Sequence, residues 1–350
     1  MKTYKVIGVM SGTSLDGLDI AYCEFSANPG WNFKLICAET YSYDQFWGEK
    51  LSSLHLMEAP ELVQTDFVYG RFIGERINSF IKRHRLSPDF IASHGHTAFH
   101  QPAKGLTLQT GNGNAISSIT KLPVVFDFRA MDVALGGQGA PLVPIGDRLL
   151  FGAFDYCLNI GGIANISYEV NNNRIAWDIC PANMVLNYLS RKTGASYDKD
   201  GELAASGKIE QSLLKQLEAW DYYTEKPPKS LGREDVEEFI FPLIENDRTS
   251  LPDLLRTYTE HISKCIGKVA QGQHKKMLIT GGGAFNQFLI SRIRANTDVE
   301  VVIPEVGIIE FKEALVFAFL GVLRMENQIN CLASVTGAKR DCCCGIIAYT

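Results

Sequence analysis

The chain begins with Tyr4-Lys5-Val6-Ile7-Gly8-Val9-Met10, continues through Ser11-Gly12-Thr13-Ser14-Leu15-Asp16-Gly17, and resumes as Leu18-Asp19-Ile20-Ala21-Tyr22-Cys23-Glu24-Phe25. The first segment is apolar and β-branched and the third alternates between the two faces, so both predict β-strands. The segment between them is rich in glycine and small hydroxyl residues, which is typical of a tight turn. A third strand over residues 33–41 completes an antiparallel meander, and this meander decides the fold.

Beyond the meander, helical and strand patterns alternate. Apolar residues at helical spacing predict a helix over 61–84 and another over 114–121, and short apolar segments predict strands at 89–92, 106–109 and 123–128. The second half repeats this order, with strands at 156–160, 164–170, 174–179, 276–280 and 299–303 and helices over 212–220, 254–269, 284–295 and 312–326. A meander followed by α/β alternation, occurring twice, predicts an α/β protein of two similar lobes.

The lobe boundaries follow from composition. We place an N-terminal lobe at residues 1–134 together with the C-terminal segment 335–350, and a C-terminal lobe at 135–334, with the glycine-rich stretch 136–141 as the junction. An insert over 225–248, rich in proline and charge, predicts a surface excursion or lid.

Composition excludes several classes of protein. The 350 residues are 46% hydrophobic and 21% charged, with a net charge of -5, which argues against a disordered chain or a general nucleic-acid surface. We expect no membrane span and a cytoplasmic location, and nine cysteines, an odd number, do not suggest a disulfide framework. The run Cys342-Cys343-Cys344 predicts buried or incidental thiols, because adjacent cysteines do not easily direct three sulfurs at one ion.

The turn after the first strand is the strongest candidate site. Backbone amides in a turn containing Gly12, Thr13, Ser14 and Gly17 can surround a phosphate. Asp16 and Asp19 flank it, where a carboxylate could hold Mg²⁺ directly or through water. An ordinary glycine-rich hairpin turn is the alternative. Further candidates are the equivalent turn of the repeat and a glycine turn between strand and helix: Gly161, Gly162, Gly281, Gly282 and Gly283.

Several motifs match one family in chain order. The stretch Gly8-Val9-Met10-Ser11-Gly12-Thr13-Ser14-Leu15-Asp16-Gly17-Leu18-Asp19 resembles the signature of the anhydro-N-acetylmuramic acid kinases, and further matches lie at 93–97, 108–112, 127–129, 132–144, 159–165, 281–286 and 334–338. The resemblance implies an α/β fold of duplicated ribonuclease-H-like lobes, as in the actin-like ATPases and hexokinases, with a central nucleotide cleft. It implies ATP and Mg²⁺ as cofactors, and it is compatible with a homodimer.

The resemblance also implies a reaction. The family opens the ring of 1,6-anhydro-N-acetylmuramic acid with water and phosphorylates O6 from ATP, in cell-wall recycling. The implied nucleotide site is Gly12, Thr13, Ser14, Leu15, Asp16, Gly17, Leu18, Asp19, Gly161, Gly162, Gly281, Gly282, Gly283 and Asn286. The implied sugar site is His94, Gln109, Asn112, Asp127 and Arg129, with Arg129 suited to the lactyl carboxylate.

Two carboxylates match the family's catalytic positions. Asp178 falls at the catalytic aspartate, although capping of the following helix is the alternative. Glu313 matches a glutamate near the attacking water, and an equally good account is a first-turn helix glutamate favoured by the helix dipole.

The chain departs from the family pattern at three single positions and in the segment Ile308-Ile309-Glu310-Phe311, which replaces an acidic run before Glu313. Cys180 and Ala182 replace glycines of the catalytic stretch, and His96 replaces a glutamine of the sugar stretch. A Cβ at a position that needs positive φ would force the loop to be remodelled, and a histidine can change hydrogen bonding or pH sensitivity. Two alternatives therefore stay open: a catalytically impaired nucleotide-binding sensor, and a kinase of another amino sugar.

Overall fold

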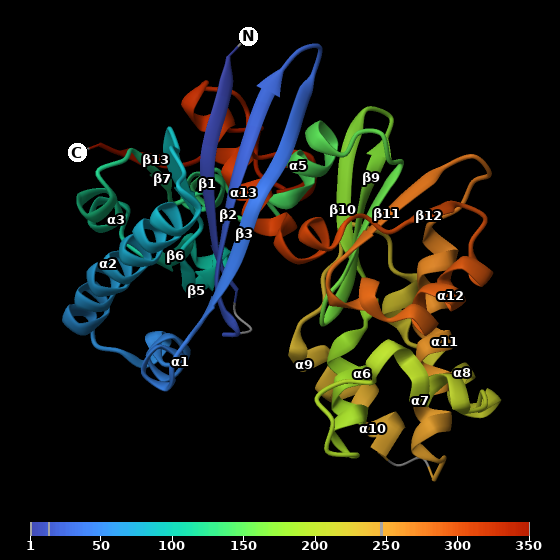
Figure 1. Ribbon diagram of the computed structural model, residues 1–350. Coiled ribbons are helices and arrows are strands. Elements are labelled where there is room, and N and C mark those ends of the chain that lie inside the picture. The colour runs from blue at the N-terminus through green and yellow to red at the C-terminus, as the bar shows by residue number, and fades with distance from the viewer. Residues whose placement is uncertain (1, 13–14, 246–247, 350) are drawn as a thin grey trace. The chain divides into compact units, whose positions relative to one another are not determined.

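The computed structural model describes residues 2–12, 15–245 and 248–349. The chain divides into two compact units, unit 1 formed by residues 1–150 and 311–350 and unit 2 by residues 151–310 (Figure 1). The described residues contain no helix both long and apolar enough to cross a membrane.

Unit 1 is built on a six-stranded sheet with the order β13-β7-β4-β1-β2-β3. Its strands are β1 Thr3–Ser11, β2 Gly17–Ala27, β3 Trp31–Ser42, β4 Phe90–Ser93, β7 Val124–Phe126 and β13 Ile346–Ala348. The first three strands are antiparallel neighbours, whereas β4 is parallel to β1 and β7 is parallel to β4. The predicted meander is confirmed, and the β1–β2 register pairs Ser11 with Leu18 beside the candidate phosphate turn.

Unit 2 repeats this topology. Its sheet has the order β10-β9-β8-β11-β12, from β8 Tyr156–Ile160, β9 Ile163–Val170, β10 Asn173–Pro181, β11 Lys276–Thr280 and β12 Glu300–Val302. Here too the first three strands form an antiparallel meander and the last two continue in parallel. Both sheets therefore follow the ribonuclease-H-like order 3-2-1-4-5, which confirms the duplicated α/β fold.

A two-stranded ribbon, β5 His96–Gln101 and β6 Leu106–Thr110, completes the strands of unit 1. The sequence predicted β6 but not β5, because residues 96–101 are mostly polar and show no apolar periodicity.

The helices of unit 1 are α1 Gln45–Ser52, α2 Ala59–His84, α3 Gly113–Thr120, α4 Ala130–Ala134, α5 Val143–Leu150, α13 Val306–Met325 and α14 Ala333–Thr336, although α13 begins in unit 2. Helix α13 lies directly on β1, since a Cβ added to Gly8 would sit 1.9 Å from the carbonyl oxygen of Ala314. Phe311 interrupts the helical geometry of α13 with φ -114° and ψ 15°, and the division between the units falls there.

The predicted lobe boundaries differ from this division. A Cβ added to Gly146 of α5 would lie 2.8 Å from Val316 of α13, so α5 packs within unit 1. Helix–helix packing, and not the glycine-rich stretch 136–141, therefore decides where the chain changes unit.

The helices of unit 2 are α6 Asn183–Arg191, α7 Glu202–Ser206, α8 Gln211–Glu218, α9 Arg233–Asp235, α10 Phe241–Glu245, α11 Leu251–Val269 and α12 Gln287–Asn296. The predicted surface excursion at 225–248 is only partly right. Val236, Ile240 and Ile244 of this segment are buried in the core of unit 2, which anchors the insert.

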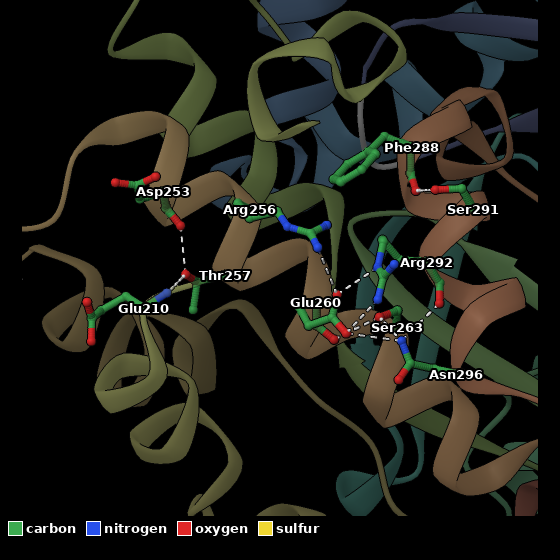
Figure 2. A network of polar contacts seen from close by, with 10 residues as sticks. All are labelled: Glu210, Asp253, Arg256, Thr257, Glu260, Ser263, Phe288, Ser291, Arg292 and Asn296. Carbon is green, nitrogen blue, oxygen red and sulfur yellow. Dashed lines mark hydrogen bonds and ion pairs between the residues drawn. The ribbon is translucent and has the colours of Figure 1, made fainter. Parts of the chain in front are cut away.

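Buried charges join α11 to α12 in unit 2, as Figure 2 shows. Arg292 donates to both oxygens of the Glu260 carboxylate, at 2.8 and 3.1 Å, and the Asn296 amide donates to it at 3.2 Å. Burial disfavours the charged carboxylate, but the hydrogen bonds from Arg292 and Asn296 outweigh that penalty and lower the pKa of Glu260. A bidentate pair of this kind fixes the two helices against each other.

We expect Glu260→Gln to destabilise unit 2 by about 2–3 kcal/mol at pH 7, because it leaves the Arg292 fork without its carboxylate. Because the folded pKa is depressed, the stabilisation is present above the unfolded carboxyl pKa and disappears as pH falls through the folded value. Chemical denaturation at pH 7 and pH 3 measures both effects. In the matched control Glu237→Gln, which breaks an exposed pair with Arg233, the loss should stay within about 0.5 kcal/mol. Equal losses in the two variants would contradict the assignment.

Candidate functional site

A chain of hydroxyl groups surrounds the end of β1 in unit 1. The Ser11 hydroxyl lies 2.7 Å from the Tyr43 hydroxyl, which lies 2.6 Å from that of Tyr69. Ser11 also lies 2.9 Å from Nδ1 of His96 on β5. The first strand, the third strand and the ribbon are therefore joined by hydrogen bonds just before the candidate phosphate turn.

The turn itself is partly described, since Thr13 and Ser14 lie outside the described residues. The Leu15 amide donates to the carbonyl of Gly12 at 3.3 Å, and Leu15 has a φ of 60°. This left-handed conformation is uncommon for a leucine and is typical of a tight turn. Asp16 is exposed, while Leu18 is fully buried in the core of unit 1 and offers a ligand only its backbone. Gly17 is fixed by packing, because an added Cβ would lie 2.8 Å from the carbonyl oxygen of Tyr41.

Arg129 is held by two hydrogen bonds. Its Nε donates to Nε2 of His94 at 2.9 Å, and Nη1 donates to the carbonyl of Gly139 at 2.6 Å. Nδ1 of His94 lies 2.8 Å from the carbonyl of Gly95, so this nitrogen carries the ring proton. Burial and the nearby Arg129 charge keep the pKa of His94 well below its usual range. His94 therefore positions Arg129, and Nη2 of Arg129 has no hydrogen-bond partner among the described residues.

Gln109 and Asn112, two other residues of the predicted sugar site, differ in whether their side-chain oxygen is hydrogen-bonded. The Gln109 amide donates to Thr107 at 3.0 Å, while its buried Oε1 finds no partner in the described part of the chain. Asn112 caps α3 through Oδ1 and donates its amide to Asp66 at 2.9 Å, so both ends of this side chain are occupied. An unsatisfied acceptor such as Gln109 Oε1 favours a ligand donor nearby.

Asp127 has a left-handed backbone with φ 57°, unusual for a residue other than glycine. Its Oδ1 accepts from the Ala130 amide at 3.3 Å at the start of α4, and burial raises the pKa of the Asp127 carboxyl. A half-buried acid with a left-handed backbone, two residues before Arg129, is the kind of feature that gathers at functional sites.

Glu313 lies near charges from three parts of unit 1. Its side chain is exposed to solvent, yet desolvation by the surrounding protein raises the pKa of Glu313. The nearby Arg129 charge opposes this shift, and the Asp19 charge adds to it. The Asp19 carboxylate accepts from the Thr40 hydroxyl at 2.6 Å. Because α13 begins at Val306, Glu313 is not in the first turn of the helix as predicted, although it follows the irregular residue Phe311.

Asp178 borders a β-bulge of β10 in unit 2. The pairing register with β9 shifts between Asp178 and Cys180. The backbone amide of Leu231 donates to its Oδ2 at 2.9 Å, while no donor among the described residues reaches Oδ1. Burial raises the pKa of Asp178, and the Leu231 hydrogen bond only partly opposes that shift. The helix-capping alternative does not hold, since α6 begins at Asn183 and the residue before it, Ala182, forms no side-chain cap.

The insert positions Asp178. Besides the Leu231 amide, the Lys229 carbonyl accepts from the Asp178 amide at 3.2 Å, and the Tyr222 hydroxyl donates to the Asp178 carbonyl. The Lys229 ammonium lies 5.0 Å from the centre of the Trp177 ring. The sequence missed these partners because no local pattern links residues about fifty positions apart.

Neither residue that replaces a glycine of the catalytic stretch has the left-handed backbone conformation. Cys180 does not have positive φ, and Ala182 has a φ of -129°. Both side chains are fully buried in the core of unit 2. The Cβ atoms are therefore accommodated without remodelling the loop.

The candidate nucleotide glycines of unit 2 fall into two groups. Gly281 and Gly283 are required by packing, since an added Cβ would lie 2.7 Å from Asn159 and 2.2 Å from Ile160 respectively. At Gly161, Gly162 and Gly282 an added Cβ would meet nothing closer than 3.6, 3.7 and 3.7 Å. Neither packing nor backbone conformation explains this second group, which leaves room for a ligand to approach the backbone.

A pocket of about 410 Å³ lies beside these glycines within unit 2. Its lining includes Asn183, Gly282, Phe285 and Asn286 as well as the polar turn 197–200. Asn286 caps α12 through its oxygen, and the buried Thr259 hydroxyl in the pocket wall has no partner among the described residues. The sequence missed the turn 197–200, although Asp198-Lys199-Asp200-Gly201 carries an ordinary turn signal.

We expect His96→Gln to make the protein more resistant to acid. Burial lowers the pKa of His96 to about 4, so the folded protein resists a proton that the unfolded chain accepts from about pH 6.5 downward. Stability is therefore lost as pH falls from 6.5 to 4, by about 3 kcal/mol for this group, and the variant should be spared that loss. Denaturation midpoints at pH 7 and pH 4 measure it, with the exposed His55→Gln as control. A difference between the denaturation midpoints at pH 7 alone would not support the mechanism. If the unchanged protein, His96→Gln and His55→Gln all lost the same stability between pH 7 and pH 4, the mechanism would be refuted.

The sequence profile described as "Anhydro-N-acetylmuramic acid kinase" matches residues 4–350. The chain belongs to this family. The anhydro-N-acetylmuramic acid kinase of Saccharophagus degradans is 37% identical to it, with 100% of both chains covered. That of Mannheimia succiniciproducens is 36% identical, with 99% of both covered.

Among solved structures, component A of the Acidaminococcus fermentans (R)-2-hydroxyglutaryl-CoA dehydratase aligns with 90% of this chain and 96% of its own, at 12% identity and a TM-score of 0.46. The fold of this anhydro-N-acetylmuramic acid kinase family member is established by the strand order of its two sheets. Family membership makes the chain a sugar kinase, and the residues described above are its candidates for binding and catalysis.

Proposed function

We propose that the protein hydrolyses the anhydro bond of 1,6-anhydro-N-acetylmuramic acid and transfers the γ-phosphoryl group of ATP to O6. The products are N-acetylmuramic acid 6-phosphate and ADP. The observation that carries this proposal is the Asp178 carboxyl: it is held by one backbone amide, its second oxygen has no protein donor among the described residues, and burial raises its pKa. These are the properties of a general base.

The first step is attack of water on the anomeric carbon C1 of the sugar. Asp178 accepts a proton from that water as the C1–O bond forms, and the bond between C1 and O6 breaks. A base with a pKa above that of an ordinary carboxyl holds the abstracted proton better, which favours this role. Oxygen O6 is thereby released and becomes the nucleophile for phosphoryl transfer.

The sugar is recognised by unit 1 in this proposal. Nη2 of Arg129 has no hydrogen-bond partner among the described residues, while Nε and Nη1 are fixed by His94 and Gly139, so the guanidinium is oriented before a carboxylate arrives. The lactyl carboxylate of muramic acid is a planar anion that suits this group. The unsatisfied Oε1 of Gln109 suits a hydroxyl or amide donor of the sugar.

The phosphates are proposed to lie at the turn from Gly12 to Gly17. Two residues of this turn, Thr13 and Ser14, lie outside the described residues. Asp19 and Glu313 fit a divalent cation there, because the Asp19 charge raises the pKa of Glu313 and a cation would relieve that repulsion. Bound Mg²⁺ would neutralise charge on the phosphates during transfer. Asp16 is exposed at the same turn and is proposed as a third carboxylate for the cation.

The adenosine part of ATP is proposed to occupy the pocket of unit 2. A volume of about 410 Å³ suits a small ligand, and the open backbone at Gly282 and the unpartnered Thr259 hydroxyl offer contacts. The backbone at Gly161 and Gly162 is open in the same way, and we propose that phosphate oxygens approach it.

Turnover of purified substrates tests the function. We expect ADP release only when 1,6-anhydro-N-acetylmuramic acid is present, with one phosphate on O6 of the opened sugar by mass spectrometry and NMR. The same anhydro sugar without the lactyl group should react poorly. ATP binding without turnover of any sugar would support the impaired sensor, and faster turnover of a different amino sugar would reassign the substrate.

We further propose that the reaction takes place in the cytoplasm, where ATP is available, and that the protein forms a homodimer. The open edge of β3, a strand of 12 residues, is a surface through which two sheets could pair. Sedimentation of the purified chain decides between monomer and dimer.

A further inference from the structure

Three cysteines of unit 1 converge at one buried point. The Sγ atoms of Cys331, Cys342 and Cys344 all lie within 4.8 Å of one another, and those of Cys342 and Cys344 are 3.3 Å apart. Sulfurs bound at about 2.3 Å to a tetrahedral ion lie about 3.8 Å apart. The three sulfurs are therefore already close to the spacing of metal ligands.

The backbone explains how this set is formed. Residues 342 and 344 lie two positions apart on an extended segment and share one face, which turns Cys343 away. Cys331 forms an antiparallel bridge with Cys342, with reciprocal backbone hydrogen bonds of 3.1 Å. As predicted from the sequence, the three adjacent cysteines do not direct all their sulfurs at one point, since Cys343 is outside the cluster. The sequence pattern missed Cys331, which supplies the third sulfur.

A carboxylate lies beside Cys331, outside the group of three converging sulfurs. Oδ1 of Asp132, on α4, lies 3.2 Å from Sγ of Cys331 and is fully buried. Oδ1 also accepts from the Thr336 hydroxyl at 2.7 Å, while Oδ2 accepts from the Gly139 amide at 2.7 Å. Three converging sulfurs are typical ligands of a zinc site whose fourth position takes a further ligand, whereas Mg²⁺ and Ca²⁺ prefer oxygen alone.

The surrounding residues hold these donors in place. The Asn330 side chain accepts from the Cys344 amide at 2.6 Å and donates to the Cys344 carbonyl at 2.9 Å. Asp132 is bonded to Gly139, whose carbonyl holds Arg129 at 2.6 Å. Bonds of this kind fix ligand orientation in metal sites.

We propose that Cys331, Cys342 and Cys344 bind one Zn²⁺ ion, which ties the C-terminal segment at Cys342 and Cys344 to Cys331 within unit 1. Binding replaces the three thiol protons with bonds to the ion and involves no change of oxidation state. A disulfide would use two of the sulfurs and would leave the third sulfur without a role, so the metal accounts for more of the arrangement. The inference does not depend on the proposed reaction.

Metal analysis of the full chain, purified with reductant and reconstituted with Zn²⁺, tests this site. We expect about one zinc per chain for the unchanged protein and for Cys343→Ser, and below about 0.2 for Cys331→Ser and Cys344→Ser. Cys343 is the matched control because it lies in the same run but outside the cluster. Far-UV circular dichroism verifies that each variant folds.

Cobalt binding to the unchanged chain gives an answer even if a variant fails to fold. Co²⁺ in the site should show thiolate charge-transfer bands and the visible bands of tetrahedral coordination, and Zn²⁺ should displace them. Less than about 0.1 zinc with no cobalt bands in the fully reduced chain would overturn the proposal. So would equal zinc loss in Cys343→Ser, or seven titratable thiols out of nine in the chain purified and unfolded without reductant, which would indicate a disulfide.

Discussion

Replacing Asp178 by asparagine is expected to lower kcat by about 10²–10⁴-fold while ATP still binds. Asparagine keeps the shape of the side chain, and its oxygen can still accept from the Leu231 amide, which now bonds to Asp178 Oδ2 at 2.9 Å. The variant loses only the capacity to take a proton. Rates of ADP release with saturating anhydro sugar measure the loss, and titration with an ATP analogue measures binding.

The control for this variant is Asp221→Asn. Asp221 is an exposed aspartate of the same unit, next to Tyr222, whose hydroxyl donates to the Asp178 carbonyl. It should retain full activity. If Asp178→Asn turned over at the normal rate, another group would have to be the base. If the two variants lost activity equally, the effect would lie in the surrounding segment and not in the carboxyl.

The pH profile adds a second signature of the same carboxyl. Burial raises the pKa of Asp178 above the usual range of aspartate, and the base must be deprotonated to act. Activity should therefore fall as pH decreases through a value above that of an ordinary aspartate, and Glu313, whose pKa is also raised, would move the limb in the same direction.

The fold could be predicted because its determinants are local. The apolar pattern from Tyr4 to Tyr41 and its counterpart from Tyr156 onward each specify three neighbouring strands, independently of the helices that pack on them. The start of α13 could not be predicted, because residues 306–311 contain glycine and two adjacent isoleucines, which weaken a helical pattern. Burial of Ile309 in the core of unit 2 overrides that weak propensity.

The chemically active residues could be proposed from motifs, but their supports could not. Asp66 bonds to Gly111 and Asn112 from 45 residues away, and Leu231 bonds to Asp178 from 53 away. These bonds depend on where the backbone passes in space. The three converging cysteines show the same limit, because an antiparallel bridge, and not sequence spacing, brings Cys331 to the other two.

Arg129→Met is expected to lower kcat/KM for the anhydro sugar by about 10²–10³-fold, chiefly by raising KM. Methionine preserves much of the apolar stem but removes the charged fork, whose Nη2 has no hydrogen-bond partner among the described residues. His94 then loses its donor at Nε2, which costs stability but leaves the turn from Gly12 to Gly17 unchanged. The affinity for an ATP analogue should therefore stay the same.

A cycle of two proteins and two sugars isolates the carboxylate contact. The unchanged protein should prefer the sugar bearing the lactyl group over the same sugar without it, and Arg129→Met should prefer neither, because the guanidinium is what distinguishes them. Arg83→Met is the matched control, since Arg83 pairs with Glu39 on the exposed surface of unit 1 at 2.7 Å and should leave the preference intact. A variant at position 129 that lost activity equally toward both sugars would show that Arg129 supports the fold around His94 and Gly139, and the lactyl group would then need another partner.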